Sequence, residues 1–397
     1  MKYFKFNVKD GYYIGETKNF SVYENGILGR NEPIEISQNM SKIVDKNHFT
    51  FQYGPATGGL IEPLDFKIIT NGETIKGIFA DPYVKSRTMR CLNKKIDECL
   101  LLVERINGYH SANHSIAFLT AIEDALNLEI SEGTYYGRIV ILELERIRSH
   151  LLVLKRVCEP AGFGVPMYQL SYINEKISRI ISDISGHRYF FSTNELNKVK
   201  IDFGLLSSYI QSLIGIKREF EKIFNDLLES KIFINRLQGN GIIKEEPLIG
   251  PAARAAGIKR DARIGLSGLP YRELNFEPVT FNEGDSFGRF YIRGQEILQS
   301  FDLCINGLER ARQNDYSYNI NNESSGSGAG RLESPSGDLF YYIDIDRGRI
   351  RNIEMSSPSY LNLKTFTKSA INNIFTDFHF NFESFGIWVS EMGVEFI

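Results

Sequence analysis

A helical period runs through the stretch Arg138-Ile139-Val140-Ile141-Leu142-Glu143-Leu144-Glu145-Arg146-Ile147-Arg148-Ser149-His150. Its apolar residues return every three or four positions, and the same spacing extends from about residue 135 to residue 158. Because that spacing is the repeat of an amphipathic helix, the segment is predicted to form one long helix. Pro160 lies just beyond the predicted end, where it does not interrupt the helix.

Four further segments show the helical period, and each is long enough to contribute to a packed core. They are residues 87–128, 165–186, 205–235 and 284–312. Amphipathic helices bury their apolar stripes against one another, so we expect these segments to form a bundle with the 135–158 helix.

Strand and turn signals occupy the two ends of the chain. Residues 1–80 contain aromatic and β-branched clusters, and Asn71-Gly72 between two apolar runs predicts a hairpin. Asp346-Arg347-Gly348 predicts a second hairpin near the end of the chain. Residues 321–330, which are polar and rich in glycine and serine, predict a flexible loop.

The fold expected from these patterns is α+β and mainly α, with a long-helix bundle as its core and small β-rich lobes. We expect a β-rich lobe at residues 1–85 and the helical bundle at residues 86–320. Residues 321–397 are expected to form a C-terminal hairpin and a tail that returns to the bundle.

The charge of the chain argues against nucleic-acid binding. Among 397 residues, 46 Lys and Arg face 49 Asp and Glu, a formal net charge of −3, and no long basic block occurs. No run of apolar residues is long enough to cross a membrane, and the N-terminus lacks the apolar core of a signal peptide. We therefore expect an intracellular protein that meets a membrane only through partner proteins.

The cysteines and the common catalytic motifs exclude several classes of site. The 4 cysteines are scattered with no C-x-x-C, so we expect reduced thiols packed in helices. The glycine-rich run at 326–330 lacks a following Lys and Ser or Thr, which favours a connector over a phosphate-binding loop. Asp344 and Asp346 alternate on a predicted strand, where a solvated face is favoured over a metal pair.

One segment contains two histidines at a spacing that could form a functional site. In Arg105-Ile106-Asn107-Gly108-Tyr109-His110-Ser111-Ala112-Asn113-His114, the two histidines lie four residues apart and share one helical face. Such a pair can bind a metal or relay protons, although core histidines with satisfied hydrogen bonds are the alternative.

This segment resembles the R-x-C-G-x-C-x-x-x-H motif of nickel–iron hydrogenase large subunits, with Asn107 and His110 at the cysteine positions. Further matches to group 4 enzymes of the formate hydrogenlyase type follow in the same order along the chain. They are residues 54–63 (GPATGGLIEP), 138–150, 158–163, 186–189, 333–343 and 358–363 (PSYLNL). The resemblance covers about residues 50 to 397 and includes the related D (49 kDa) subunit of complex I. It implies the large-subunit fold of that family.

The resemblance also implies that the nickel site has been lost. Nickel in these enzymes is held by four thiolates, and soft sulfur donors are what such a centre requires. At the second cysteine pair this chain has Trp388 and Glu391, and Ser336 replaces the arginine expected beside the iron ligands. Thr57 replaces the usual histidine of the opening motif. We therefore expect no metal here and no hydrogenase activity by this chain itself.

The complex I relatives suggest which residues act instead. Tyr109 and His110 lie in the segment that holds the quinone headgroup there, and would donate hydrogen bonds or protons to a reduced acceptor. His114 would orient that segment. Glu62 would carry protons between the cavity and membrane subunits, or would be a salt-bridged carboxylate near the lobe junction.

Three functions remain open. The first is the nickel-free large subunit of a membrane-associated, complex I-like or group 4 hydrogenase-like oxidoreductase. It would take electrons from a 4Fe–4S cluster in a small partner subunit to a quinone or another acceptor in the emptied cavity. The second is a non-catalytic structural or energy-coupling subunit, and the third is an unrelated metal-dependent enzyme using His110, His114 and Glu391. The resemblance implies antiporter-like membrane partners and a cytoplasmic, peripheral position on the inner face of the cell membrane.

Overall fold

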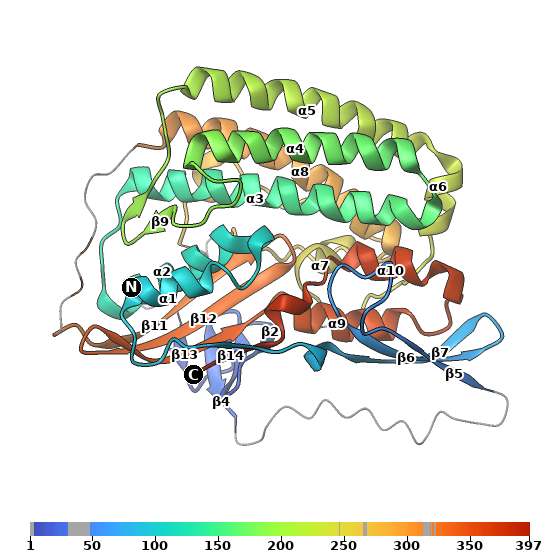
Figure 1. Cartoon of the computed structure of the whole chain (residues 1–397), viewed down its shortest axis with the longest axis horizontal. Helices are drawn as coiled ribbons and strands as arrows, with labels where there is room; N and C mark the ends of the chain where they lie inside the picture. Colours follow the sequence, from blue (N-terminus) through green and yellow to red (C-terminus); the bar gives the residue numbers. More distant parts are fainter. Residues whose placement is uncertain are drawn as a thin grey trace.

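Helices and a three-stranded sheet form the centre of the protein. The computed structural model describes residues 4–30, 48–245, 247–264, 268–312, 318, 320 and 323–397. The helices of this part are α1 (Ile96–Val103), α2 (Ser111–Leu126), α3 (Glu132–Cys158), α4 (Gly164–Ser185), α5 (Leu206–Glu229), α6 (Lys231–Leu237), α7 (Gly250–Ala255), α8 (Ser286–Arg310), α9 (Pro358–Ser369) and α10 (Phe378–Phe385). In Figure 1, α3, α4, α5 and α8 lie along one another as the upper layer. The expected α+β fold with a helical core is confirmed.

The strands form small sheets rather than one large one. An N-terminal sheet contains β1 (Lys5–Phe6), β2 (Tyr13–Glu16), β3 (Phe20–Tyr23) and β4 (Gly26–Gly29), and a second contains β5 (Phe49–Tyr53), β6 (Asp65–Asn71) and β7 (Thr74–Asp81). The central sheet contains β11 (Gly326–Ser334), β12 (Gly337–Asp346) and β13 (Arg349–Ser356). The short pairs are β9 (Asn194–Glu195) with β10 (Lys198–Val199), and β8 (Arg87–Met89) with β14 (Val394–Phe396). Both predicted hairpins are confirmed, as β6–β7 and β12–β13.

Residues 87–128 do not form one continuous helix, so this prediction is wrong. The chain forms a strand at β8, then α1, and a break before α2. At the break Asn107 is extended, with φ −139°, and its side-chain oxygen accepts a hydrogen bond from the backbone N of Tyr109. That bond starts a short 3-10 helix (Gly108–His110) that leads into α2. Because apolar residues continue across the break, the helical period alone does not reveal it.

The glycine-rich run is a strand, not the predicted flexible loop. Residues 326–330 begin β11, which pairs with β12 along its whole length and packs against α2. A Cβ atom at Gly328 would lie 2.4 Å from the carbonyl oxygen of Ala121, and one at Gly330 would lie 2.1 Å from that of Ala117. Because only glycine leaves room for this contact, alternate glycines let the helix lie directly on the strand.

The four cysteines are buried and free, as expected, but Cys91 does not lie in a helix. Cys91 belongs to the turn before α1, where its backbone carbonyl oxygen lies 3.2 Å from the Sγ of Cys99. The apolar residues around it place the thiol in the core whether or not the backbone is helical.

The C-terminal segment after α10 runs back to the start of the bundle. β14 pairs with β8 in parallel, with Val394 opposite Arg87. The guanidinium of Arg87 also donates to the carbonyl oxygens of Ile106 and Ser390. These contacts place residues 386–391 beside residues 105–114. The division into regions 1–85, 86–320 and 321–397 stays a prediction.

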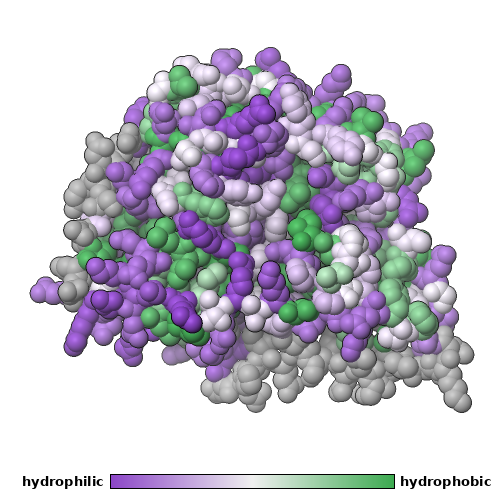
Figure 2. Space-filling model, viewed as in Figure 1, coloured by the Kyte–Doolittle hydropathy of each residue, from purple (hydrophilic) through white to green (hydrophobic). Residues whose placement is uncertain are grey.

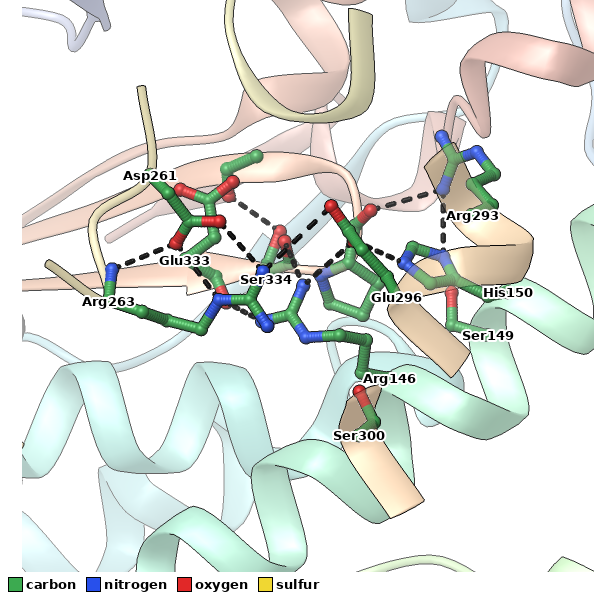
Figure 3. A network of polar contacts seen from close by, with 12 residues as sticks. Arg146, Ser149, His150, Asp261, Arg263, Arg293, Glu296, Ser300, Glu333 and Ser334 are labelled. Atoms are coloured by element: carbon green, nitrogen blue, oxygen red, sulfur yellow. Dashed lines mark hydrogen bonds and ion pairs between the residues drawn. The ribbon is translucent and has the colours of Figure 1, made fainter. Parts of the chain in front are cut away.

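A network of buried charged side chains joins α3, α7, α8 and the central sheet (Figure 3). Its members are each at most 4% exposed. They are Glu143, Arg146, His150, Arg254, Asp261, Arg263, Arg293, Glu296 and Glu333. Arg254 lies at the centre, with Nε 2.6 Å from Glu296 and NH1 2.7 Å from Glu333 and 3.1 Å from Asp261. Buried charges of this kind persist only when each has a partner.

Glu333 should make stability depend on pH. Burial, followed by the negative charge of Asp261, raises the pKa of Glu333 to about 7 from 4.5. The folded state therefore binds a proton that the unfolded state has lost between these values, so stability falls as pH rises through that window. Relative to Glu333→Gln, the wild type should lose about 3 kcal/mol of unfolding free energy between pH 4.5 and 8. Urea unfolding of both proteins at several pH values measures this. A constant difference would contradict it.

The face of the molecule in Figure 2 is mostly hydrophilic, with hydrophobic residues in small, separate patches. Within the described ranges, no helix combines the length and the apolar character needed to cross a bilayer.

Candidate functional site

The four positions at which the resemblance expects thiolates lie together in the structure. Asn107 and His110 come from the break before α2, and Trp388 and Glu391 come from the segment after α10. Oε1 of Glu391 accepts from Nδ2 of Asn107 at 2.9 Å and lies 2.6 Å from Nδ1 of His110. We call these four residues the Glu391 cluster.

Two serine hydroxyls bind the other oxygen of the same carboxylate. Ser357 and Ser359 donate to Oε2 of Glu391 at 2.6 and 3.0 Å, and Nε2 of His114 lies 3.5 Å from Oε1. Burial on its own would raise the pKa of Glu391, but His110 and His114 lower it well below its usual value. The carboxylate is therefore charged and surrounded by donors on all sides.

His110 is hydrogen-bonded through both ring nitrogens, and His114 through Nδ1. Nε2 of His110 lies 3.0 Å from the hydroxyl of Ser149 on α3, and Nδ1 of His114 lies 2.8 Å from the hydroxyl of Tyr341 on β12. Burial, and next the charge of Glu391, raises the pKa of Tyr341. Both histidines are completely buried, so they are joined to solvent only through other side chains.

Trp388 closes the cluster toward Tyr109. Its ring stacks on that of Tyr109 with centroids 5.3 Å apart, and meets the ring of His110 edge-on at 5.2 Å. With the hydrogen bonds to Glu391, these contacts fill the space between the four positions. At the place where the sequence predicted an emptied cavity, the replacing side chains thus contact one another.

An open cleft lies on the outer side of Tyr109. It has a volume of about 230 Å³, and its lining includes Tyr109, Arg148, Lys155, Arg188 and Tyr189. The guanidinium of Arg148 lies between two rings, 4.8 Å from that of Tyr109 and 4.7 Å from that of Tyr189. Burial raises the pKa of Tyr109, so its hydroxyl stays protonated near neutral pH. We call this space the Tyr109 cleft.

Three other predicted site residues do not contact Glu391. Glu62 accepts from the backbone N of Ser390 at 3.1 Å, so its loop rests on the same C-terminal segment. Ser336 donates to the carbonyl oxygen of Gly386 at 2.7 Å, just before Trp388. Thr57 lies in the loop between β5 and β6, where its hydroxyl lies 3.5 Å from the carbonyl oxygen of Gly58. The structure therefore brings Glu62 and Ser336 to the edge of the site and leaves Thr57 outside the cluster.

Sequence reasoning missed several residues of the site. Ser149, Ser357, Ser359 and Tyr341 all bind a member of the cluster or His114. Ser357-Pro358 has the pattern of a helix start, and Ser357 indeed caps α9. That pattern predicts the cap but not the second bond to Glu391, because nothing local shows which residue lies opposite.

Comparisons with known proteins find relatives among the subunits of respiratory complexes. The family described as the 49 kDa subunit of respiratory-chain NADH dehydrogenase matches residues 162–324. The alpha subunit of the membrane-bound hydrogenase of Pyrococcus furiosus is 26% identical over 352 residues, which cover 82% of each chain. The D subunit of the NADH-quinone oxidoreductase of Protochlamydia amoebophila is 29% identical over 65% of this chain and 66% of that one.

The chain is similar to these large subunits over most of its length.

A solved structure supports the fold. A chain of the membrane-bound sulfane sulfur reductase, an archaeal respiratory membrane complex, superposes with a TM-score of 0.81 at 18% identity, covering 88% of this chain and 99% of that one. These relatives are subunits of membrane-associated oxidoreductase complexes.

The nickel–iron centre of the hydrogenase members does not fit the side chains of this site. The four positions supply an amide, an imidazole, an indole and a carboxylate, whereas nickel of this kind needs thiolates. Both oxygens of Glu391 and both nitrogens of His110 are already engaged. Among the described residues, no group of three or more His, Cys, Asp or Glu is arranged to hold a metal ion.

Proposed function

We propose that this chain is the nickel-free large subunit of a membrane-associated, complex I-like or group 4 hydrogenase-like oxidoreductase. A small partner subunit would supply electrons from a 4Fe–4S cluster, and the large subunit would direct them to a quinone or another acceptor. Antiporter-like membrane subunits would hold the complex on the inner face of the cell membrane. The observation that carries the proposal is the meeting of Asn107, His110, Trp388 and Glu391 without a thiol among them.

The acceptor would bind in the Tyr109 cleft rather than between the four positions. Tyr109 is the predicted catalytic residue that lines this cleft, and Arg148 and Lys155 give it positive charge suited to a carbonyl that becomes anionic on reduction. Tyr109 would donate a hydrogen bond or proton from its hydroxyl. His110 would supply protons indirectly through Ser149, the neighbour of Arg148.

Glu62 keeps the role expected for it within this proposal. Its carboxylate accepts a hydrogen bond from the backbone N of Ser390, the residue next to Glu391. We assign it to proton movement between this site and the membrane subunits.

Changing Tyr109→Phe should slow acceptor reduction by about tenfold or more, since a positioned proton donor contributes at least that much. The ring stacking on Trp388 and Arg148 survives in this variant, so assembly should be unaffected. The assay is quinone-dependent electron transfer by the intact complex. Tyr172→Phe, an exposed tyrosine of α4, is the matched control and should keep the wild-type rate. Equal turnover in both variants would remove Tyr109 from this role.

A non-catalytic coupling subunit is the second candidate, and the closed Glu391 cluster favours it. A buried cluster whose carboxylate is hydrogen-bonded through both oxygens stabilises the junction of two segments whether or not electrons pass nearby. An intact complex that assembles but reduces no acceptor would support this alternative. We do not propose metal-dependent chemistry at His110 and His114, because binding a metal there would break the contacts that hold Glu391.

A further inference from the structure

A second cavity, separate from the Tyr109 cleft, reaches the Glu391 cluster at Glu391 itself. It has a volume of about 410 Å³ and lies between the N-terminal sheet, β13 and the C-terminal segment. Its lining includes Ser357 and Glu391, together with the exposed residues Lys18, Asn19 and Glu395, through which it opens to solvent. We call it the Ser357 cavity.

Ser357 joins this cavity to the buried carboxylate. Its hydroxyl donates to Oε2 of Glu391 at 2.6 Å, and the residue is 8% exposed. Ser359 binds the same oxygen at 3.0 Å but is 0% exposed and does not line the cavity. Of the two serines that bind Glu391, Ser357 is therefore the one that lines the cavity.

The hydrogen bonds continue from the carboxylate toward the Tyr109 cleft. Oε1 of Glu391 lies 2.6 Å from Nδ1 of His110, and Nε2 of that ring lies 3.0 Å from Ser149. Ser149 is next in sequence to Arg148, which lines the cleft. A row of hydrogen-bonded groups thus runs from the Ser357 cavity through Glu391 and His110 as far as Ser149.

We propose that the Ser357 cavity is the inlet for the protons consumed in acceptor reduction, and that the Ser357 hydroxyl passes them to Glu391. This inference rests on the proposed function. For each proton used, a hydronium ion in the cavity gives a proton to the Ser357 oxygen and becomes water, as the Ser357 hydroxyl proton moves to Glu391. One proton leaves the Glu391–His110 pair at the imidazole, toward the acceptor, so the pair returns to its starting charge.

The first test needs no turnover. In the intact complex, Ser357→Cys should react with a small, water-soluble methanethiosulfonate reagent, because solvent reaches this position. Ser359→Cys, at a completely buried position, should resist it, and so should the wild type, whose cysteines are buried. If Ser357→Cys also resists the reagent, solvent does not enter by this cavity and the proposal is wrong.

The second test measures proton delivery. Ser357→Ala should lower the rate of quinone reduction by about tenfold and increase its solvent deuterium isotope effect, because proton transfer becomes limiting. Ser357→Thr keeps the hydroxyl and should restore both values. It also restores the cap on the backbone N of Ser359, which the alanine variant loses.

Tyr360→Phe provides the control within the same cavity. It removes a hydroxyl from a residue that lines the cavity but is not one of the donors to Glu391, so rate and isotope effect should not change. Wild-type values in Ser357→Ala would overturn the inlet while leaving the proposed function intact. If the wild-type complex reduces no acceptor, the proposed function fails, and the labelling result then decides whether solvent reaches Ser357.

Discussion

Replacing Arg254→Met should destabilise the protein by about 3–5 kcal/mol, the usual cost of removing one partner from a buried ion pair. Arg254 binds three carboxylates, those of Glu296, Glu333 and Asp261, and all four groups are completely or almost completely buried. Methionine fills similar space but leaves three negative charges close together with one fewer cation. Urea unfolding of the purified protein gives the difference.

Lys259→Met tests whether the effect comes from burial. Lys259 is close to Arg254 in the sequence and also forms an ion pair, with Glu277 at 2.7 Å, but both side chains are mostly exposed. Its loss should change stability by about 0.5 kcal/mol or less, as expected of a surface pair. Similar effects of the two substitutions would show that the buried network contributes no more than surface charges do.

Glu391→Gln should lower acceptor reduction by about 100-fold or more, the lower range of general acid–base contributions. Glutamine has nearly the same shape and can still accept from Ser357, so the complex should assemble. It carries no negative charge, however, and cannot hold or pass the proton shared with His110 across their 2.6 Å contact. The measurement is quinone reduction by the assembled complex, with assembly checked separately.

Glu98→Gln is the control for a carboxylate outside the site. Glu98 lies on α1 and forms an exposed pair with Lys94, so its neutralisation should leave turnover unchanged. Full turnover in the Glu391→Gln complex would exclude the carboxylate from proton transfer. That outcome would favour the coupling subunit, in which the cluster only joins two segments.

Local sequence signals predicted the long elements of the fold well. The helix at 135–158 is close to α3, and the Asn-Gly and Asp-Arg-Gly turns are the ends of real hairpins. Local signals fail where the same sequence pattern is compatible with two different backbone structures. Apolar residues continue through the break at Asn107, and glycines read as a loop can equally be a strand pressed against a helix.

The site could not be predicted from local sequence patterns alone. The resemblance to a family placed residues 105–114 and 386–391 together, and the contact of His110 with Glu391 shows that they meet. It could not predict that the replacing side chains fill the space, because that follows from the size of Trp388 and from hydrogen-bond geometry. The network around Arg254 was also missed, since its members are widely separated along the chain.

The direct contact of α2 with β11 allows the chemistry of this site to change while its geometry is kept. Gly328 and Gly330 fix how closely the helix that carries His114 approaches the sheet that carries Tyr341, without using any side chain of the site. The scaffold and the reactive groups are thus encoded by separate residues. Substitutions among the reactive groups therefore leave the close packing of α2 on β11 unchanged, since the glycines that permit this packing lie outside the site.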